Sequence, residues 1–332
     1  LYEHPRFAEG FKATLQRKEI TLSGVGRTGT AQVARVTTEI GEALEGAWLV
    51  NVVVPATGHE LFFSEMIPHL EDGQVVVVWA GDFGSLRLAK LIQERAPSRR
   101  IHVMEANTLP YGTRLVGPAS VALLLEAPRI AVAALPARET GELLPRLAAL
   151  WPGVFPVRNV LEAALSNPNP ICHPPGSLLN VGSIQRPGGD FRMYGEGITE
   201  AVARVIRAVY DETAAVAAGL GIDVIRYEDR DFRTKSSIMG VAFQAPFDTD
   251  GVIGDIVGPK SIEDRYITED LPYGLVPISQ LGDAAGVPTP VIDSFVNIGS
   301  RVCGRDFWRE GRTLKDLGLE GLSAREIVAA VS

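Results

Sequence analysis

The chain has little of what marks several classes of protein. It has two cysteines in 332 residues, too few for a disulfide framework, so we expect a reducing, cytoplasmic setting. No apolar run approaches the roughly 18 residues that a membrane span needs. The net charge of −8 and the isoelectric point near 5.3 lack the basic excess typical of nucleic-acid-binding proteins. We therefore expect neither a nucleic acid nor a membrane as partner.

The chain has ample apolar sequence for a large core. Hydrophobic residues make up 46% of it, and its length suggests two domains. In the first half, Trp48–Val54 is a continuous apolar run that ends at Pro55, as expected of a buried parallel strand. The other strands predicted for this sheet are Gln74–Trp79, Ile101–Glu105, Leu115–Leu125, Arg129–Ala134 and Gly153–Val157, separated by helices such as Glu60–Leu70 and Ser85–Gln93. The alternation predicts an α/β domain over residues 1–157, with a mostly parallel, Rossmann-like sheet.

The pattern changes after about Val157. No ladder of strands follows, and apolar residues recur with the period of a helix. The predicted helices include Gly197–Ala218, Arg233–Ala245, Leu275–Ala285, Pro290–Cys303 and Ser323–Val331. We therefore predict that residues 158–332 form an all-α domain.

A glycine motif near the start matches a dinucleotide-binding turn but lacks its context. Residues 24–29 read Gly-Val-Gly-Arg-Thr-Gly and follow a predicted strand. A helix should come next, yet the residues from Ala31 to Thr37 have β character. The next buried strand ends at Val54 without the acidic residue that the fingerprint requires. We predict a glycine-rich hairpin here instead.

The first residues offer a better indication of a cofactor. Leu1-Tyr2-Glu3 looks like the end of the second strand of a Rossmann fold, with Glu3 where an acid binds the adenosine ribose. The first strand, its glycine turn and the first helix would then precede Leu1. The alternative is that Glu3 is an ordinary surface acid. Glu3 favours NAD because an acid repels a 2′-phosphate, whereas the nearby Arg6 keeps NADP open.

Two segments far apart in the sequence carry residues suited to proton transfer. His173 lies in Ile171–Asn180, next to prolines, and Arg265–Pro277 contains both Arg265 and Asp270. A titratable base, a carboxylate that orients it and a guanidinium that holds an anion suit proton transfer on a small acid.

These segments also carry a family resemblance. The chain resembles the opine dehydrogenases of the octopine and nopaline group, and within it the bacterial N-(1-carboxyethyl)-norvaline type. The residues that match are Val54-Pro55-Ala56, Glu105, His173-Pro174, Leu178-Leu179-Asn180, Arg265-Tyr266, Glu269-Asp270, Gly274-Leu275-Val276-Pro277, Gly286-Val287-Pro288-Thr289-Pro290, Asp306-Phe307, Glu310-Gly311-Arg312-Thr313-Leu314 and Leu317-Gly318-Leu319. The glycine turn of the family's first strand is missing from the match.

The resemblance implies a fold and a reaction. A Rossmann domain would hold NAD or NADP, and a helical domain would supply the acid/base chemistry, with the active site between them. The family condenses the amino group of an L-amino acid with a 2-oxo acid and reduces the imine with the dinucleotide. Which amino acid and which oxo acid are used is left open, and a homodimer is conceivable without a visible interface.

The resemblance also gives roles to three residues. His173 would be the catalytic acid/base, Asp270 its carboxylate partner, and Arg265 the clamp on a substrate carboxylate. Residue chemistry alone leaves alternatives open. His173 could cap a turn, Glu269 is as suitable a carboxylate as Asp270, and Arg265 could pair with a neighbouring acid.

Further candidates rest on position in the predicted sheet. Glu105 ends a strand and Asp82 follows one, where ligands bind in open α/β sheets, so both are expected near the substrate. The backbone of Val54, Pro55 and Ala56 is expected to pass the cofactor. Asn180 would bind the nicotinamide amide or the oxo acid, or else bond to backbone within its helix.

Two other functions fit the same architecture. One is a 2-hydroxy-acid or glycerol-phosphate-like dehydrogenase, for which a lysine base would be expected, but Lys235 and Lys260 lie in no comparable motif. The other is a non-catalytic homologue that lacks the cofactor cradle.

Overall fold

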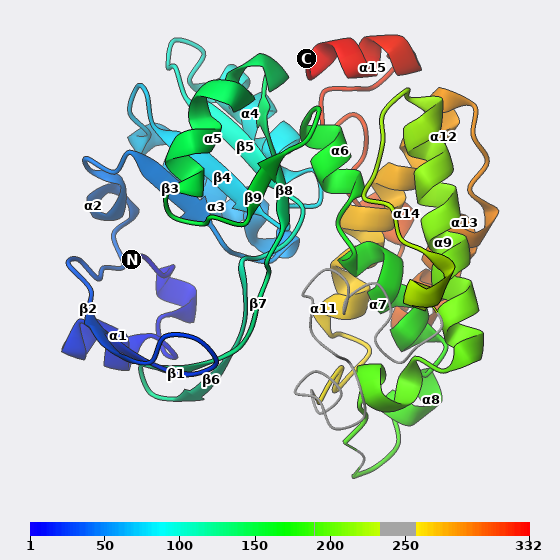
Figure 1. Cartoon of the computed structure of the whole chain (residues 1–332), viewed down its shortest axis with the longest axis horizontal. Helices are drawn as coiled ribbons and strands as arrows, with labels where there is room; N and C mark the ends of the chain where they lie inside the picture. Colours follow the sequence, from blue (N-terminus) through cyan, green and yellow to red (C-terminus); the bar gives the residue numbers. More distant parts are fainter. Residues whose placement is uncertain (189, 233–256) are drawn as a thin grey trace.

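The computed structural model describes residues 1–188, 190–232 and 257–332. Figure 1 shows a sheet-based N-terminal half beside a helical C-terminal half, as predicted. The predicted helix Arg233–Ala245, and Lys235 within it, lie outside the described residues. Among the residues described, no helix is long and apolar enough to cross a membrane.

The main sheet has five strands in the order β3-β4-β5-β8-β9. Their bounds are Leu49–Val52, Val75–Trp79, His102–Ala106, Ile130–Leu135 and Val154–Pro156. The first three pair in parallel, as predicted, whereas β8 runs antiparallel to β5 and parallel to β9. β8 and β9, at one end of this Rossmann-like sheet, therefore both run opposite to β3, β4 and β5.

Helices cover both faces of this sheet, which explains the continuous apolar run of β4. Val76 and Val78 pack into one core cluster, and Val75 and Val77 into another on the opposite face. The helices of this half are α1 (Lys12–Arg17), α2 (Ile40–Leu44), α3 (His59–Met66), α4 (Gly84–Arg95) and α5 (Thr140–Ala148). Leu88 and Leu91 of α4 pack on the first face, and Leu143 and Leu147 of α5 on the second.

A second sheet, in the order β2-β1-β7-β6, was not predicted. Its strands are Glu19–Gly24 (β1), Gly29–Gln32 (β2), Tyr111–Gly117 (β6) and Ser120–Glu126 (β7). The prediction that Leu115–Leu125 continues the parallel sheet is wrong, because Pro118 and Ala119 turn that run into an antiparallel hairpin. The glycine motif connects β1 and β2 as an antiparallel hairpin, as predicted, and Gly24 and Gly26 take positive φ there.

The C-terminal half is helical, as predicted, and the structure describes no strand in it. Its helices are α6 (Val160–Leu165), α7 (Asn169–Leu178), α8 (Val181–Ile184), α9 (Glu200–Gly219), α11 (Arg265–Thr268), α12 (Val276–Ala285), α13 (Pro290–Cys303), α14 (Phe307–Glu310) and α15 (Ala324–Ala330). The sequence explains where several end: Thr199 caps the start of α9, and Gly286 and Gly304 close α12 and α13 at positive φ. Two π-helical segments, Met193–Gly197 and Asp270–Leu275, interrupt this pattern.

Contacts between the halves bring the carboxyl ends of the parallel strands toward the helical half. Arg312, which follows α14, is buried and donates to the carbonyls of Gly81 and Asp82 in the turn after β4. At the other end of the interface, the backbone N–H of Ala137 donates to the carbonyl of Val331 after α15. Because the backbone N–H of Arg312 also donates to the carbonyl of Pro272, the turn after β4 is held near the segment Asp270–Leu275.

Candidate active site

His173 and Asp270, from segments far apart in the chain, form a buried hydrogen-bonded pair in the helical half. Nδ1 of His173 lies 2.7 Å from Oδ2 of Asp270, and both residues are 1% exposed. His173 lies in α7, and Asp270 begins a π-helical segment. Such segments occur frequently at functional sites because they redirect side chains out of the regular helical register.

Two tyrosines complete the surroundings of the imidazole, and sequence reasoning missed both. The hydroxyl of Tyr194 lies 2.8 Å from Nε2 of His173. The ring of Tyr266 stacks on the imidazole, with 3.8 Å between the ring centroids and 10° between the planes. Tyr266 was visible beside Arg265, but Tyr194 lies in the segment Met193–Gly197, which carries no catalytic motif.

Burial sets the protonation of this pair. Burial, together with the nearby Arg265 cation, lowers the pKa of His173 to about 3. Burial and the negative charge of Glu269 raise the pKa of Asp270 well above its ordinary value. An ion pair of imidazolium and carboxylate is therefore disfavoured here, and the imidazole is neutral in the unliganded protein. With Nδ1 bonded to Asp270, Nε2 is the nitrogen that faces Tyr194.

Arg265 lies at the edge of this pair, partly open to solvent. Its side chain is 48% exposed, and its guanidinium lies 5.4 Å from the centroid of the Tyr266 ring. Its Nη1 is 3.5 Å from Oε2 of Glu269, which is buried. A half-exposed guanidinium beside a buried imidazole is suited to hold an anion that enters from solvent.

Asp82 approaches the site from the turn after β4. It is 3% exposed and takes a positive φ of 45°, and its Oδ1 accepts a 2.6 Å hydrogen bond from Asn167. Burial raises the pKa of Asp82, and the charges of Asp270 and Glu269 raise it further. The structure thus brings Asp82 within electrostatic range of the His173–Asp270 pair.

Glu105 has no exposed surface, although it was expected near the substrate. Its two carboxylate oxygens accept from the backbone N–H groups of Phe83 (2.9 Å) and Ser85 (2.7 Å). Burial raises the pKa of Glu105 to about 7, against these hydrogen bonds, which lower it. This carboxyl group ties the turn that carries Asp82 to strand β5.

The turn Val54-Pro55-Ala56 follows β3 and reaches the site through one contact. The backbone N–H of Ala56 donates to Oε1 of Glu269 over 2.6 Å, while Pro55 keeps an exposed surface. The carboxyl end of a parallel strand is where a dinucleotide passes in this fold. The backbone there is consistent with the predicted cofactor contact.

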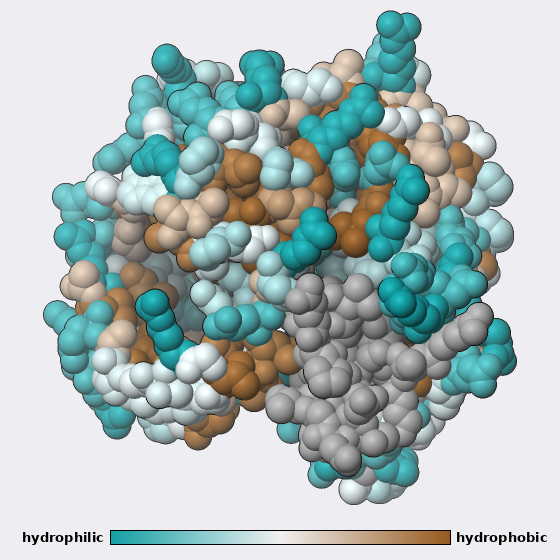
Figure 2. Space-filling view, viewed as in Figure 1, coloured by the Kyte–Doolittle hydropathy of each residue, from teal (hydrophilic) through white to brown (hydrophobic). Residues whose placement is uncertain are grey.

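Glu3 and Asn180 lie apart from the pair. Glu3 borders a groove of about 490 Å³ between the N-terminal residues and β3, where Figure 2 shows apolar surface around a hollow. Strand β3 pairs only with β4 among the described strands, so its other edge faces this groove. The amide nitrogen of Asn180 donates to the carbonyls of Gly176 (2.9 Å) and Gly197 (3.1 Å).

The comparisons with known proteins identify the family. The model of the NAD/NADP octopine/nopaline dehydrogenase alpha-helical domain matches residues 156–303. The opine dehydrogenase of Arthrobacter sp. (strain 1C) is 31% identical over 325 residues, which cover 98% of this chain and 90% of that protein. The chain belongs to the opine dehydrogenase family.

Solved structures of this family share the fold. Octopine dehydrogenase with NADH and pyruvate superposes with a TM-score of 0.69 at 19% identity, covering 98% of this chain and 90% of that one. Yersinopine dehydrogenase with NADP⁺ gives 0.69 at 16% identity, covering 100% and 91%. The predicted fold, a Rossmann-like sheet with a helical C-terminal region, is thereby confirmed.

Membership of the opine dehydrogenases fixes the class of reaction. The protein is an NAD(P)-dependent oxidoreductase that acts on CH–NH groups, and it joins an L-amino acid to a 2-oxo acid by reduction of an imine. NAD or NADP as cofactor is likewise confirmed.

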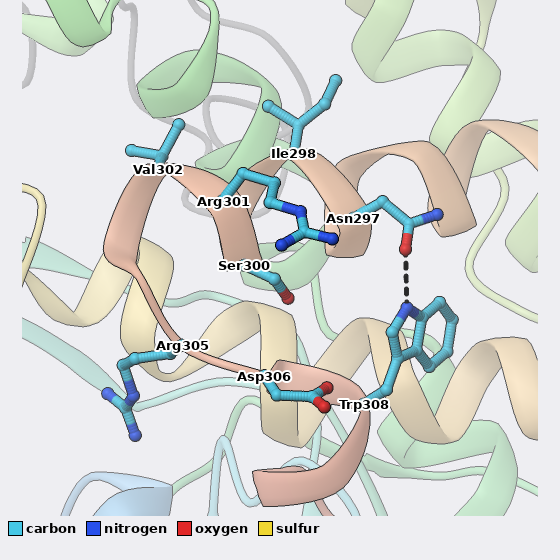
Figure 3. Close-up of a pocket in the computed structure, with 8 residues that line it drawn as sticks. All are labelled: Asn297, Ile298, Ser300, Arg301, Val302, Arg305, Asp306 and Trp308. Carbon is cyan, nitrogen blue, oxygen red and sulfur yellow. Dashed lines mark hydrogen bonds between the residues drawn. The ribbon is translucent and has the colours of Figure 1, made fainter.

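A separate hollow of about 620 Å³ lies on the helical half (Figure 3). Residues of α13, α14 and the turn between them line it, and Trp308 donates to the side chain of Asn297 over 2.9 Å. The lining includes none of the residues expected to bind substrate or cofactor. This hollow is therefore distinct from the candidate active site.

Proposed function

We propose that His173 and Asp270 move the protons of the reductive condensation, and that Arg265 holds the 2-oxo acid. The observation that carries this proposal is the buried 2.7 Å hydrogen bond between Nδ1 and Asp270. When Asp270 is ionised, its carboxylate accepts from Nδ1–H and fixes the imidazole tautomer, so Nε2 presents its lone pair toward Tyr194 and can accept a proton. A substrate nitrogen that reaches Nε2 has to take the place of the Tyr194 hydroxyl.

The proton transfers would then occur in the following order. Nε2 of His173 takes one proton from the substrate ammonium, and the free amine adds to the carbonyl carbon of the oxo acid. One proton then passes from the nitrogen to the oxygen of the adduct, which gives the neutral carbinolamine. The imidazolium, stabilised by Asp270, returns the proton to the hydroxyl of the carbinolamine, which leaves as water and gives the iminium ion. The hydride for the iminium carbon would come from NADH or NADPH when it is bound. The resulting secondary amine takes up one proton from solvent.

Arg265 suits the carboxylate of the oxo acid because its planar guanidinium can bind a carboxylate through two parallel hydrogen bonds. Its stacking contact with Tyr266 places it next to the ring that covers His173. Asp82 lies within electrostatic range of the pair and is proposed to bind the substrate ammonium, whose positive charge would favour the ionised form of this carboxyl group. For Glu105 we propose an indirect role, through the turn that it holds.

For the cofactor we propose contacts from the backbone of Val54, Pro55 and Ala56 and from Glu3, with Asn180 near the nicotinamide. The described residues contain no glycine turn beside β3. The open edge of β3 and its apolar groove suit a further strand that would carry such a turn. Glu3 at the rim of that groove favours NAD, although a relative binds NADP⁺.

The domain bounds, the location and the oligomeric state of the enzyme are also part of this proposal. We propose that residues 1–157 form the cofactor domain and residues 158–332 the substrate domain. A cytoplasmic location is proposed because two cysteines in 332 residues are too few for a disulfide framework. A homodimer stays a prediction.

The substrate pair is tested by a panel. Because octopine dehydrogenase has been solved with pyruvate, we expect pyruvate to be accepted as the oxo acid. The purified protein is incubated with NADH or NADPH and each pair of an L-amino acid and a 2-oxo acid, and loss of absorbance is followed together with the mass of the product. Cofactor oxidation that needs both substrates and gives the condensed secondary amine supports the proposal. Oxidation with the oxo acid alone would instead indicate a hydroxy-acid dehydrogenase.

A further inference from the structure

Glu269 connects the two halves of the molecule at the edge of the site. It is 4% exposed, and its two carboxylate oxygens bond to different partners. Oε1 accepts a 2.6 Å hydrogen bond from the backbone N–H of Ala56, in the turn after β3. Oε2 lies 3.5 Å from Nη1 of Arg265. One side chain thus touches both the proposed cofactor turn and the proposed substrate clamp.

The contact with Ala56 is a helix cap supplied from the opposite half. Ala56 begins the short 3₁₀ helix Ala56–Gly58, which leads directly into α3, and its own N-cap residue Pro55 provides no side-chain hydrogen bond. The first N–H groups of a helix need acceptors, and a carboxylate is a favourable one. Any shift of this turn therefore changes the position of Glu269.

The contact with Arg265 orients a side chain that is otherwise half exposed. Among the described residues, Glu269 is the carboxylate within ion-pair distance of this guanidinium. Arg265 also lies over Tyr266, so these two neighbours define where its guanidinium points. A long exposed side chain without such a partner samples many rotamers.

We propose that Glu269 is a positioning residue that couples cofactor binding to 2-oxo acid binding. A cofactor that orders the turn at Ala56 fixes Glu269, and Glu269 in turn fixes Arg265 for the substrate carboxylate. Coupling of this kind is reciprocal, so the oxo acid must tighten cofactor binding by the same factor. This inference rests on the proposed roles of Arg265 and of the turn, and it adds a residue that neither role requires.

The test is a binding measurement without turnover. NADH fluorescence gives the Kd of the cofactor with and without the 2-oxo acid that is most active in the panel, and no amino acid is present. For the wild type we expect the oxo acid to tighten NADH binding by about 5-fold or more, the lower end of typical couplings. In Glu269→Gln the amide oxygen still accepts from Ala56, but the charge that orients Arg265 is lost. We expect the ratio of the two Kd values to fall below about 2 there, and the oxo-acid KM to rise about 10-fold.

Lys90→Met is the matched control. Lys90 donates to the carbonyl of Lys315, so the variant also loses a hydrogen bond across the interface, but on α4 and at the surface. In this variant the oxo acid should tighten NADH binding by the same factor as in the wild type. Should Glu269→Gln fail to fold, Glu269→Asp keeps the charge on a side chain one methylene shorter, too short for both contacts, and the same loss of coupling is expected.

The outcomes separate this inference from the proposed function. Turnover in the panel with unchanged coupling in Glu269→Gln, or no coupling in the wild type, overturns the role of Glu269 alone. A wild type that turns over no pair of substrates overturns the proposed function itself.

Discussion

Two buried polar clusters lie near the interface between the halves, and their polar atoms bond to different kinds of group. The dyad cluster consists of His173, Asp270, Tyr194 and Tyr266, and each imidazole nitrogen in it meets a titratable side chain. The turn cluster consists of Asp82, Glu105 and Arg312. There Glu105 accepts from backbone N–H groups, and Arg312 donates to backbone carbonyls.

The difference shows that burial and charge alone do not identify a catalytic group. Glu105 is as buried as His173, and burial shifts the pKa of each, down for His173 and up for Glu105. Backbone amides cannot exchange protons with Glu105 at neutral pH, so its hydrogen bonds hold a turn in place. The partners of His173 can exchange protons with it, which is what acid/base catalysis needs.

The largest expected effect tests the dyad cluster. His173→Ala removes the group that takes and returns the proton, and we expect kcat to fall by about 10²–10⁴-fold, the usual contribution of general acid–base catalysis. NADH affinity should change little, since no proposed cofactor contact involves the imidazole. Steady-state rates and a fluorescence titration measure the two quantities. A near-normal rate would contradict the assignment.

A smaller effect is expected from the cation at the edge of the dyad cluster. Arg265→Ala removes the proposed clamp, and the KM for the 2-oxo acid should rise by about 10–100-fold, the cost of one charge-assisted carboxylate contact. The KM for the amino acid should change much less. Arg301→Ala, at the separate hollow of Figure 3, serves as the control. An unchanged KM for the 2-oxo acid would contradict the proposal that Arg265 binds its carboxylate.

The smallest effect on turnover is expected from the turn cluster. Glu105→Gln keeps the shape of the side chain but loses one acceptor, so kcat should stay within about 3-fold while unfolding costs about 1–3 kcal/mol less. The pKa of Glu105 is raised from 4.5 to about 7 in the folded protein. Protonated Glu105 therefore contributes stability that is fully present below pH 4.5 and is lost as the pH rises through 7.

The pH dependence sharpens this last test. The difference in unfolding free energy between wild type and Glu105→Gln should be largest near pH 5 and narrow toward pH 8, by up to roughly 3 kcal/mol. Denaturant titrations at the two pH values measure it. A difference that stays constant between pH 5 and pH 8 would mean that Glu105 is ionised throughout this range. A loss of kcat above about 100-fold would indicate that Glu105 takes part in the chemistry.

Much of the fold and part of the site could be predicted from the sequence. The apolar run of β4 identifies a buried strand, whereas the prediction of a fully buried strand over Trp48–Val54 is wrong, because β3 lies at the sheet edge with Trp48 and Val53 exposed. The glycines after α12 and α13 stop those helices because they accept positive φ. His173 and Asp270 stand in segments with recognisable motifs. The second sheet was missed because Leu115–Leu125 has the apolar run of one strand but folds as two.

What the sequence determined by itself is local: the period of each helix and strand, the ends of several helices, and the residue types suited to proton transfer. Only the tertiary structure decided which polar groups meet. Tyr194 reaches Nε2 of His173 from a π-helical segment, Glu105 turns inward to backbone amides, and Glu269 connects Ala56 with Arg265. These contacts depend on how the two halves pack, because hydrogen bonding between distant residues leaves no periodic pattern in the sequence.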